Sequence, residues 1–162
     1  MLILGIDPGL SNLGYAIVED KDPPSLVEYG VIETEKTTPY NTRLREIFER
    51  LQSLFKKYKP EVTVLEKLYF KKNVKTAMRI GEVRGVILLL TSLFNSETFE
   101  ISPSQVKSSF TGFGRAGKKE MKRMAEILFK KTIKEDDSVD AIAMALAYIN
   151  IKTFEEKGDF LS

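Results

Sequence analysis

Four acidic residues stand at places in the sequence where an unpaired carboxylate would be unfavourable. Asp7 ends the apolar run LILGID, and Glu66 ends the run EVTVLE. Asp137 and Asp140 lie three residues apart directly before the apolar stretch AIAMALA, so they share one face of a predicted buried helix. Burying an unpaired carboxylate costs several kcal/mol or forces its protonation. Such acids need a cation, a metal ion or a shell of hydrogen-bond donors.

Some of these acids also have a simpler structural explanation. Asp7 begins the sequence Asp-Pro-Gly, which is favourable turn chemistry. Acids in the first turn of a helix are stabilised by the helix dipole, which accounts for Asp136 or Asp137. The dipole explains Asp140 less well, because an acid at the edge of a buried helix needs a partner.

The four acids would converge if the two strands ran side by side with the helix packed against them. Four carboxylates without a cation repel one another. The chain contains no histidine and no cysteine, so the commonest general base and the soft metal ligands are absent. Hard oxygen ligands select Mg²⁺, and a pair of these ions about 3.5 to 4 Å apart can clamp the attacking and leaving oxygens of a phosphodiester. The residues therefore predict a site for one or two Mg²⁺ ions.

The composition predicts a single globular domain. The chain has 162 residues, of which 43% are apolar, enough for a buried core. The longest apolar run, VILLL at residues 86–90, is too short to cross a bilayer, and the first twenty residues lack the basic region of a signal peptide. We expect a cytoplasmic protein, and the lack of cysteine excludes disulfides and thiolate nucleophiles.

Basic residues are concentrated in two stretches, although the net charge is only +2. Residues 102–134 contain nine basic residues and two acids, and residues 67–84 contain six basic residues and one acid. A single lysine on a helix is usually solvated surface. Two such stretches interleaved with aromatic residues indicate a polyanionic partner, because neutralising phosphates requires many cations on one surface.

The apolar pattern predicts a mixed α/β domain. We expect three consecutive strands that form a meander, an amphipathic helix that starts near Thr38 and Pro39 and stops before Pro60, then a strand, a long helix, a strand, two basic helical segments and a terminal helix. The expected strands span residues 2–7, 13–19, 25–34, 61–66 and 98–102, and the last two long helices span residues 73–94 and about 136–151. One domain would cover residues 1–152, followed by a polar, frayed tail over 153–162.

Two glycine patterns have competing interpretations. GFGRAGKK at residues 112–119 matches part of a P-loop, but Lys119 stands where that motif needs Ser or Thr, and no apolar strand precedes it. We predict instead a basic loop that follows a nucleic-acid backbone. Gly81 and Gly85 lie four apart in the long helix, which indicates close packing, either inside the chain or between subunits.

These motifs together resemble the RuvC-type Holliday-junction resolvases, a family with the ribonuclease H-like fold. The resemblance runs through LGIDPG, LEKLYF, KNVKTAMRIGEVRGV, SPSQVKSSFTGFGRAGK and DDSVDAIAMALAY, which is most of the chain. It implies an α/β fold with a central mixed five-stranded sheet flanked by helices. It also implies that Asp7, Glu66, Asp137 and Asp140 are the catalytic, metal-binding tetrad of the family.

The resemblance further implies residues that contact DNA. Lys107 falls at the position of a catalytic lysine near the scissile phosphate, and Lys118 at that of a lysine in a DNA-facing loop. Tyr69 matches an aromatic residue placed to stack at the open centre of a junction, although it could also be a plain core residue. The remaining predicted contacts come from the two basic stretches: Phe70, Lys71, Lys72, Lys75, Arg79, Arg115 and Lys119.

The implied activity is a homodimeric endonuclease that resolves four-way DNA junctions by paired symmetric nicks in recombination and repair. Two Mg²⁺ ions per subunit, with Mn²⁺ as a substitute, would serve each site. The helix over 73–94 is the candidate dimer interface. The implied partners are junction DNA and a branch-migration complex of a junction-binding protein and an ATP-driven motor. The alternatives are a non-catalytic junction-binding module and a related nuclease that acts on RNA. An actin-like ATPase or sugar kinase would need a second phosphate-binding hairpin and a much longer chain.

Overall fold

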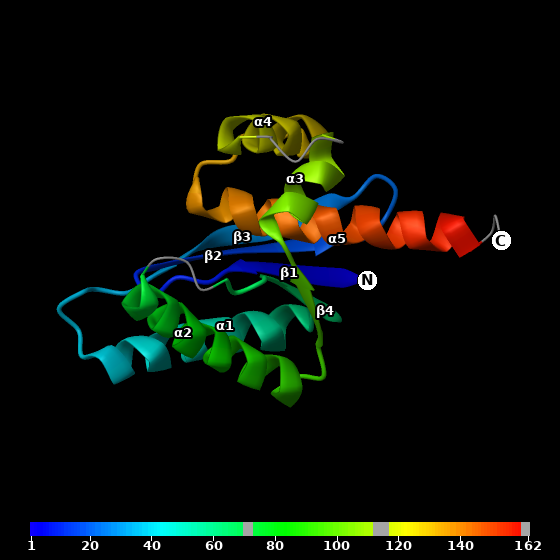
Figure 1. The fold of residues 1–162 in the computed structure, drawn as a ribbon. Helices are drawn as coiled ribbons and strands as arrows, with labels where there is room; N and C mark the ends of the chain where they lie inside the picture. Colours follow the sequence, from blue (N-terminus) through cyan, green and yellow to red (C-terminus); the bar gives the residue numbers. More distant parts are fainter. Residues whose placement is uncertain (70–72, 112–116, 160–162) are drawn as a thin grey trace.

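A five-stranded sheet runs through the middle of the molecule, with helices on both of its faces (Figure 1). The computed structural model describes residues 1–69, 73–111 and 117–159. The strands are β1 (Leu2–Asp7), β2 (Asn12–Glu19), β3 (Ser25–Glu33), β4 (Val62–Glu66) and β5 (Glu97–Ile101). The helices are α1 (Tyr40–Tyr58), α2 (Val74–Leu93), α3 (Pro103–Thr111), α4 (Lys118–Phe129) and α5 (Asp137–Asp159).

The sheet is mixed, as the sequence predicts, and its order is β3-β2-β1-β4-β5. β1, β2 and β3 form the expected antiparallel meander. β4 pairs in parallel with β1, and β5 in parallel with β4. Because Ile6 lies opposite Leu65 in the parallel register, the next residues, Asp7 and Glu66, leave the sheet at the same edge. This pairing brings the two strand-end acids together.

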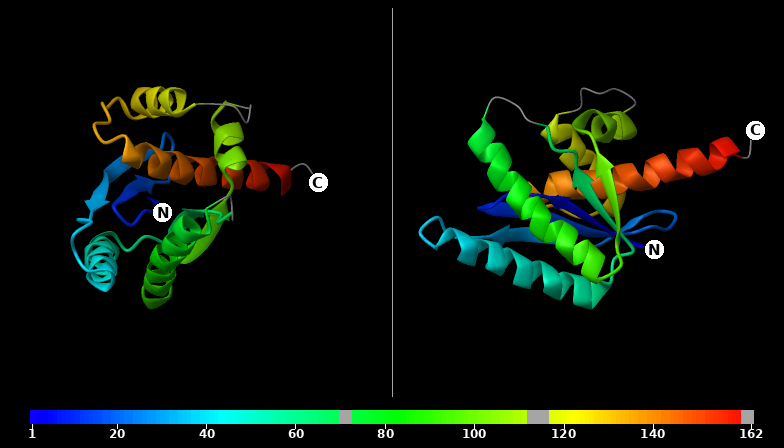
Figure 2. Two further views of the ribbon diagram at one scale, coloured as in Figure 1. Left: turned by 60° about the vertical axis from the view of Figure 1, so that its left-hand side comes forward. Right: turned by 60° about the horizontal axis from the view of Figure 1, so that its bottom comes forward.

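The two faces of the sheet are covered by different sets of helices (Figure 2). Leu4 and Ile6 of β1 pack with buried side chains of α1 and α2. Ile3 of the same strand belongs to a second core formed with α5, α3 and α4. β1 is therefore buried on both faces, which is why its side chains are apolar at nearly every position.

Two glycines allow α5 to lie directly on the sheet. A Cβ atom on Gly5 of β1 would lie 2.0 Å from the carbonyl oxygen of Ala141, and one on Gly14 of β2 would lie 2.0 Å from that of Asp137. Any larger residue would push the helix away from the strands. The two contacts fix how the first turns of α5 lie on the sheet.

The terminal helix extends further than expected. Residues 141–149 are buried, as the apolar pattern predicts, but α5 continues to Asp159 rather than ending near residue 151. Most of the expected frayed tail is therefore helical. The apolar pattern stops at Ile151 because the later turns are exposed. Good helix formers and an ion pair of 3.1 Å between Lys152 and Glu155 are compatible with a solvated helix there.

None of the helices in residues 1–69, 73–111 and 117–159 combines the length and the apolar character that crossing a bilayer requires.

The contact at Gly5 gives a stability prediction. Gly5→Ala forces a Cβ against the backbone of α5, so we expect the free energy of unfolding to fall by about 1 to 3 kcal/mol. Gly158→Ala is the matched control and should not lower the free energy of unfolding. A Cβ on Gly158 meets nothing within 4 Å, and alanine is more favourable than glycine inside a helix. Urea denaturation checks both variants. Equal stability of Gly5→Ala and the wild type would contradict the close approach.

Candidate active site

Three carboxylates meet at the edge of the sheet where β1 and β4 end. Asp7 and Glu66 are the last residues of these parallel strands. Asp140 comes from the first turn of α5, directly before Ala141, whose carbonyl lies against Gly5. Two hollows of about 200 and 210 Å³ open here and share Glu66 and Pro103 in their walls. Asp7 lines the first hollow and Asp140 lines the second.

The Asp7 carboxyl is held in an unfavourable environment. Burial raises its pKa, and the charges of Asp140 and Glu66, together with a hydrogen bond to Asp140, raise it further to about 7. Lys118 acts in the opposite direction and lowers the pKa of Asp7. Without another cation the site therefore favours a protonated Asp7 over three full negative charges.

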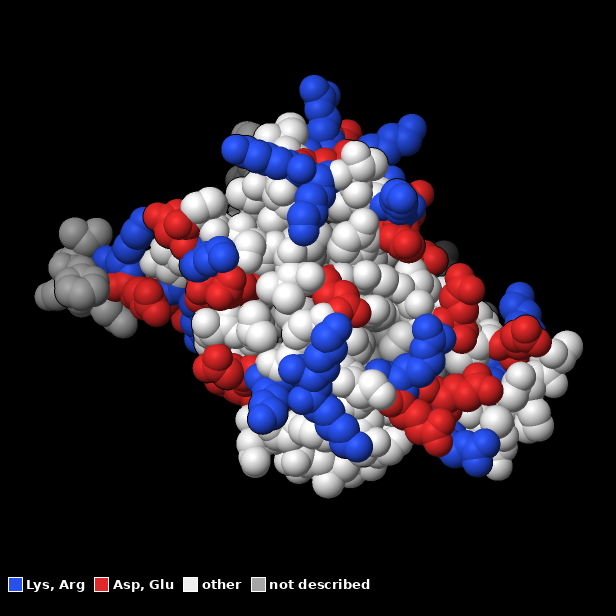
Figure 3. Space-filling view, turned by 180° about the vertical axis from the view of Figure 1, so that it is seen from behind, with Lys and Arg blue, Asp and Glu red and all other residues white. Residues whose placement is uncertain are grey.

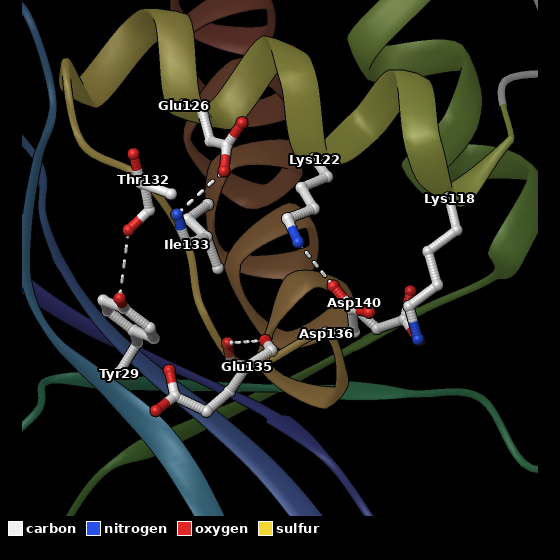
Figure 4. Close-up of polar contacts among 10 residues, drawn as sticks. Tyr29, Lys118, Lys122, Glu126, Thr132, Ile133, Glu135, Asp136 and Asp140 are labelled. Atoms are coloured by element: carbon white, nitrogen blue, oxygen red, sulfur yellow. Dashed lines mark hydrogen bonds and ion pairs between the residues drawn. The ribbon is translucent and has the colours of Figure 1, made fainter.

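Helix α4 supplies cations to the beginning of α5. The Lys118 ammonium lies 3.6 Å from Oδ2 of Asp140, and that of Lys122 lies 2.6 Å from Oδ1 of Asp136 (Figure 4). Lys118 is the first residue of α4, where the sequence analysis expected a loop. Its contact with Asp140 places it beside the acid cluster, and its contact with DNA stays a prediction.

Asp137 is less closely tied to the site than the other three acids. It is exposed, and it is the first residue of α5, one turn before Asp140. Its carbonyl oxygen packs over Gly14. Its charge is not among the causes that shift the pKa of Asp7, and the described structure records no hydrogen bond or ion pair of its side chain. Asp137 therefore stands at the margin of the cluster.

The donor chemistry of the cluster suits a hard divalent cation. Its ligand atoms are carboxylate oxygens. Burial and the charges of Asp140 and Glu66 raise the pKa of Asp7, and a cation would relieve the repulsion among these charges. In the described part of the chain, however, no three acidic side chains already stand as a group that could hold one ion. Binding a metal would thus require Asp7, Glu66 and Asp140 to turn towards a common point.

Several predicted DNA-contacting residues surround this cluster. Lys107 lines the hollow that contains Glu66 and Asp140. Tyr69 lines the hollow that contains Asp7, and its 53% exposure rules out the alternative that it is a core residue. The side chains of Lys75, Arg79 and Lys119 are exposed on α2 and α4. Phe70, Lys71, Lys72 and Arg115 lie outside the described residues.

On the face seen in Figure 3, basic side chains form separate patches. Seen from behind, Lys and Arg side chains gather at the top of the molecule, where α4 lies, and again lower down, with acidic side chains between and beside them (Figure 3). This mixture is consistent with the low net charge of +2. A polyanion on this face would contact separate basic groups.

A buried arginine, which no sequence motif points out, holds the end of the second acid's strand in place. Arg84 of α2 is only 6% exposed. Its Nη1 donates to the carbonyl oxygen of Glu66 at 2.5 Å, and its Nη2 lies 2.5 Å from Oε1 of Glu100 on β5. It fixes the end of β4 from the side of α2. The signal in the sequence is weak: Arg84 is a charged residue directly before the apolar run of residues 86–90.

The raised pKa of Asp7 predicts a pH-dependent stability of the metal-free protein. Between about pH 4 and pH 7 the folded chain keeps a proton that the unfolded chain loses, so stability falls as pH rises through this window. The full penalty, on the order of 4 kcal/mol, is present above pH 7. Asp7→Asn should therefore be more stable than the wild type at pH 8 and lose most of this pH dependence.

Urea denaturation at pH 5 and pH 8 in the presence of EDTA measures this effect. The exposed Asp22→Asn serves as a control that should keep the wild-type profile. The same pH profile for Asp7→Asn and the wild type would show that Asp7 ionises normally in the folded chain.

Comparison with known proteins places this site in a family. The model of the family "Crossover junction endodeoxyribonuclease RuvC" matches residues 3–148. The RuvC protein of Brachyspira hyodysenteriae is 45% identical over 149 residues, which cover 91% of this chain and 93% of that protein. The RuvC protein of Petrotoga mobilis is 44% identical over 162 residues, which cover 98% of this chain and 99% of that protein.

A solved structure agrees with these sequence matches. The structure of Thermus thermophilus RuvC in complex with a Holliday junction substrate has a TM-score of 0.87 and 26% sequence identity, and it covers 94% of this chain and 97% of that chain. The likeness confirms the predicted ribonuclease H-like fold with a central mixed sheet. The five sequence motifs and the length of the matched region agree with this structural likeness. This chain therefore belongs to the RuvC family of crossover junction endodeoxyribonucleases.

Proposed function

We propose that this chain is an endonuclease that resolves four-way DNA junctions by paired symmetric nicks in recombination and repair. The observation that carries the proposal is the meeting of Asp7, Glu66 and Asp140 at one edge of the sheet, beside Lys107, in a chain that matches the family over residues 3–148. A fold of this kind by itself would not specify the substrate, but the site and the family agree on phosphodiester chemistry.

The proposed cofactor is Mg²⁺, two ions per subunit, with Mn²⁺ as a substitute. Asp7, Glu66 and Asp140 would hold the ions, joined by Asp137 from the start of α5. When bound, these ions activate a water molecule and stabilise charge on the oxygens of the cut phosphate. The raised pKa of Asp7 is compatible with this role. Binding of a cation by the Asp7 carboxylate favours loss of its proton, and loss of the proton favours binding of the cation.

The protein itself supplies position and positive charge. Lys107, in the wall of the hollow that contains Glu66 and Asp140, would face the scissile phosphate and stabilise the charge that develops on it. Lys118 holds Asp140, and Arg84 holds the backbone of Glu66. Tyr69, exposed at the rim of the Asp7 hollow, would stack on a base at the open centre of the junction.

The proposed assembly is a homodimer formed through α2. This helix exposes Met78, Leu89 and Leu93 at 59%, 53% and 58%, an apolar surface that water does not favour. A Cβ on Gly85 would meet nothing within 4 Å, so the glycine is not needed for packing inside the chain. This open space supports the interpretation that α2 approaches a second copy closely, which suits a two-fold junction. The branch-migration complex and the cytoplasmic location remain predictions.

A non-catalytic junction-binding module is a weaker candidate. Such a protein has no use for three neighbouring carboxylates, one of which, Asp7, has its pKa raised to about 7 by burial and by the charges of the other two. A nuclease that acts on RNA would keep the same acids, so only the choice of substrate separates it from the proposal.

Cleavage of end-labelled substrates tests the proposed function. With Mg²⁺ we expect paired symmetric nicks in a synthetic four-way junction, and no comparable cutting of a linear duplex or of an RNA/DNA hybrid. EDTA or Asp7→Asn should abolish cleavage while Asp7→Asn still binds the junction. Preferential cutting of the hybrid would favour the RNA-directed alternative, and binding without cutting by the wild type would favour the non-catalytic one.

The contact between Arg84 and Glu66 predicts a positioning effect. Arg84→Lys loses the second donor group, so Glu66 is held less firmly and we expect the rate of junction cleavage at saturating Mg²⁺ to fall about 10-fold to 100-fold. The dissociation constant for the junction should stay near the wild-type value, because Arg84 is buried.

Glu100→Gln is the matched control for Arg84→Lys. It removes the charge of the ion pair but keeps an acceptor oxygen, so Arg84 still reaches the carbonyl of Glu66 and cleavage should change little. Thermal unfolding of both variants separates loss of activity from loss of fold. Equal rates for Arg84→Lys and the wild type would contradict the positioning role.

A further inference from the structure

A larger hollow adjoins the catalytic one on the other side of the β1–β2 turn. It has a volume of about 540 Å³ and is lined by the turn residues 8–11, by Lys36, Arg43 and Arg79, and by hydroxyl-bearing side chains that include Thr76. It shares Pro8 and Ile80 with the hollow that Asp7 lines. We call it the turn pocket. Its lining residues Arg43 and Thr76 lie near the beginnings of α1 and α2, which both begin on the left in Figure 1.

The inner wall of the turn pocket contains a buried cation that has only neutral partners. Arg43 is 5% exposed. Its Nε donates to Oγ1 of Thr34 at 2.9 Å, and its Nη2 donates to Oγ of Ser11 at 2.8 Å. No carboxylate of the described residues forms an ion pair with it. A buried guanidinium without a counter-charge is unfavourable, so the site calls for an anion.

The surroundings of Arg43 increase this positive potential. Arg43 lies in the first turn of α1, where the helix dipole is positive and where no acidic side chain is present. Lys36 and Arg79 are exposed at the rim of the pocket, and none of the described residues that line it is a carboxylate. Glu82 lies nearby, but its side chain accepts a hydrogen bond from Tyr40 and lines a neighbouring hollow. The turn pocket thus contains three cations and no acid.

We propose that the turn pocket binds a backbone phosphate of the junction DNA that neighbours the phosphate being cut. Guanidinium groups and hydroxyls are the partners that phosphate oxygens prefer, and one cation is buried where it meets them free of water. The shared wall at Pro8 and Ile80 lets one strand pass from this pocket to Asp7. This inference rests on the proposed function, since it assumes that the chain binds junction DNA.

The same contacts would couple the anchor to the catalytic edge. Arg43 holds Ser11, and Thr34 donates to the carbonyl of Leu10 at 2.5 Å, so the second half of the β1–β2 turn is tied to the wall of the pocket. Asp7 is the residue from which this turn starts. A phosphate on Arg43 would therefore fix the strand relative to Asp7 without touching the catalytic acids.

Junction binding in an Asp7→Asn background, where the DNA is not cut, tests this proposal. Lys36→Gln should weaken the binding of a synthetic four-way junction about 3-fold to 10-fold and reduce the slope of log Kd against log salt by about one. Lys56→Gln is the matched control. It makes the same charge change on an exposed lysine in the last turn of α1, far from the pocket along the helix, and should leave the slope unchanged.

Junctions with single neutral methylphosphonate linkages identify the phosphate directly. At one position near the cut, the neutral linkage should weaken junction binding by the protein that keeps Lys36. It should have little further effect on binding by Lys36→Gln, because the linkage and the substitution remove the same contact. Arg43→Gln should lose more affinity than Lys36→Gln if thermal unfolding shows that it folds. If it does not fold, Lys36→Gln, Arg79→Gln and the methylphosphonate scan still decide the question.

The outcomes separate the two proposals. The proposal for the turn pocket would be overturned if Lys36→Gln and Lys56→Gln changed junction binding equally. It would also be overturned if the effects of Lys36→Gln and of the neutral linkage added at every position. Either result would leave the proposed function intact. If the Asp7→Asn protein in which these variants are made bound a junction no better than a linear duplex, the proposed function would be overturned instead.

Discussion

The site depends on the parallel pairing of β1 with β4, which brings the carboxylates of Asp7 and Glu66 to one edge of the sheet. Two strands that ended at different edges could not bring these acids together, however similar their sequences were. The second requirement is the close contact of α5 with the sheet at Gly5, which carries Asp140 to the same edge. A strand pairing and a glycine contact therefore position a cluster that neither strand nor helix could form alone.

This arrangement has an electrostatic cost that the surrounding residues reduce only in part. Lys118 offsets the charge of Asp140, and Arg84 holds the carbonyl of Glu66 without neutralising its carboxylate. The pKa of Asp7 nevertheless rises to about 7. A cluster kept in this condition is expected where a bound cation completes the site, because the same repulsion that disfavours three bare carboxylates favours a divalent ion among them.

Much of this architecture follows from local sequence patterns. Apolar runs that end in an acid identified β1, β4 and their terminal carboxylates, and the apolar stretch after Asp140 identified a helix buried nearly all round. Local patterns could not reveal contacts between distant elements. Arg84 and Arg43 look like ordinary helix residues until the fold places one against Glu66 and the other against Ser11.

The differences from expectation have similar physical causes. The end of α5 was misplaced because its last turns are solvated and carry no apolar pattern. Spacing puts Asp137 and Asp140 on one helix face, yet only Asp140 affects the pKa of Asp7. Which of two neighbouring acids turns into a site depends on how the helix begins over Gly14, and that contact is not visible in the sequence.

The most direct test of the central claim is to locate Mn²⁺ by anomalous scattering in crystals of the protein. We predict ions between Asp7, Glu66 and Asp140, with Asp137 turned towards them, and loss of at least one ion in Asp7→Asn. Crystals in which Mn²⁺ avoids this edge of the sheet, or in which Asp7→Asn binds the ions as the wild type does, would contradict the account of these acids as a metal site.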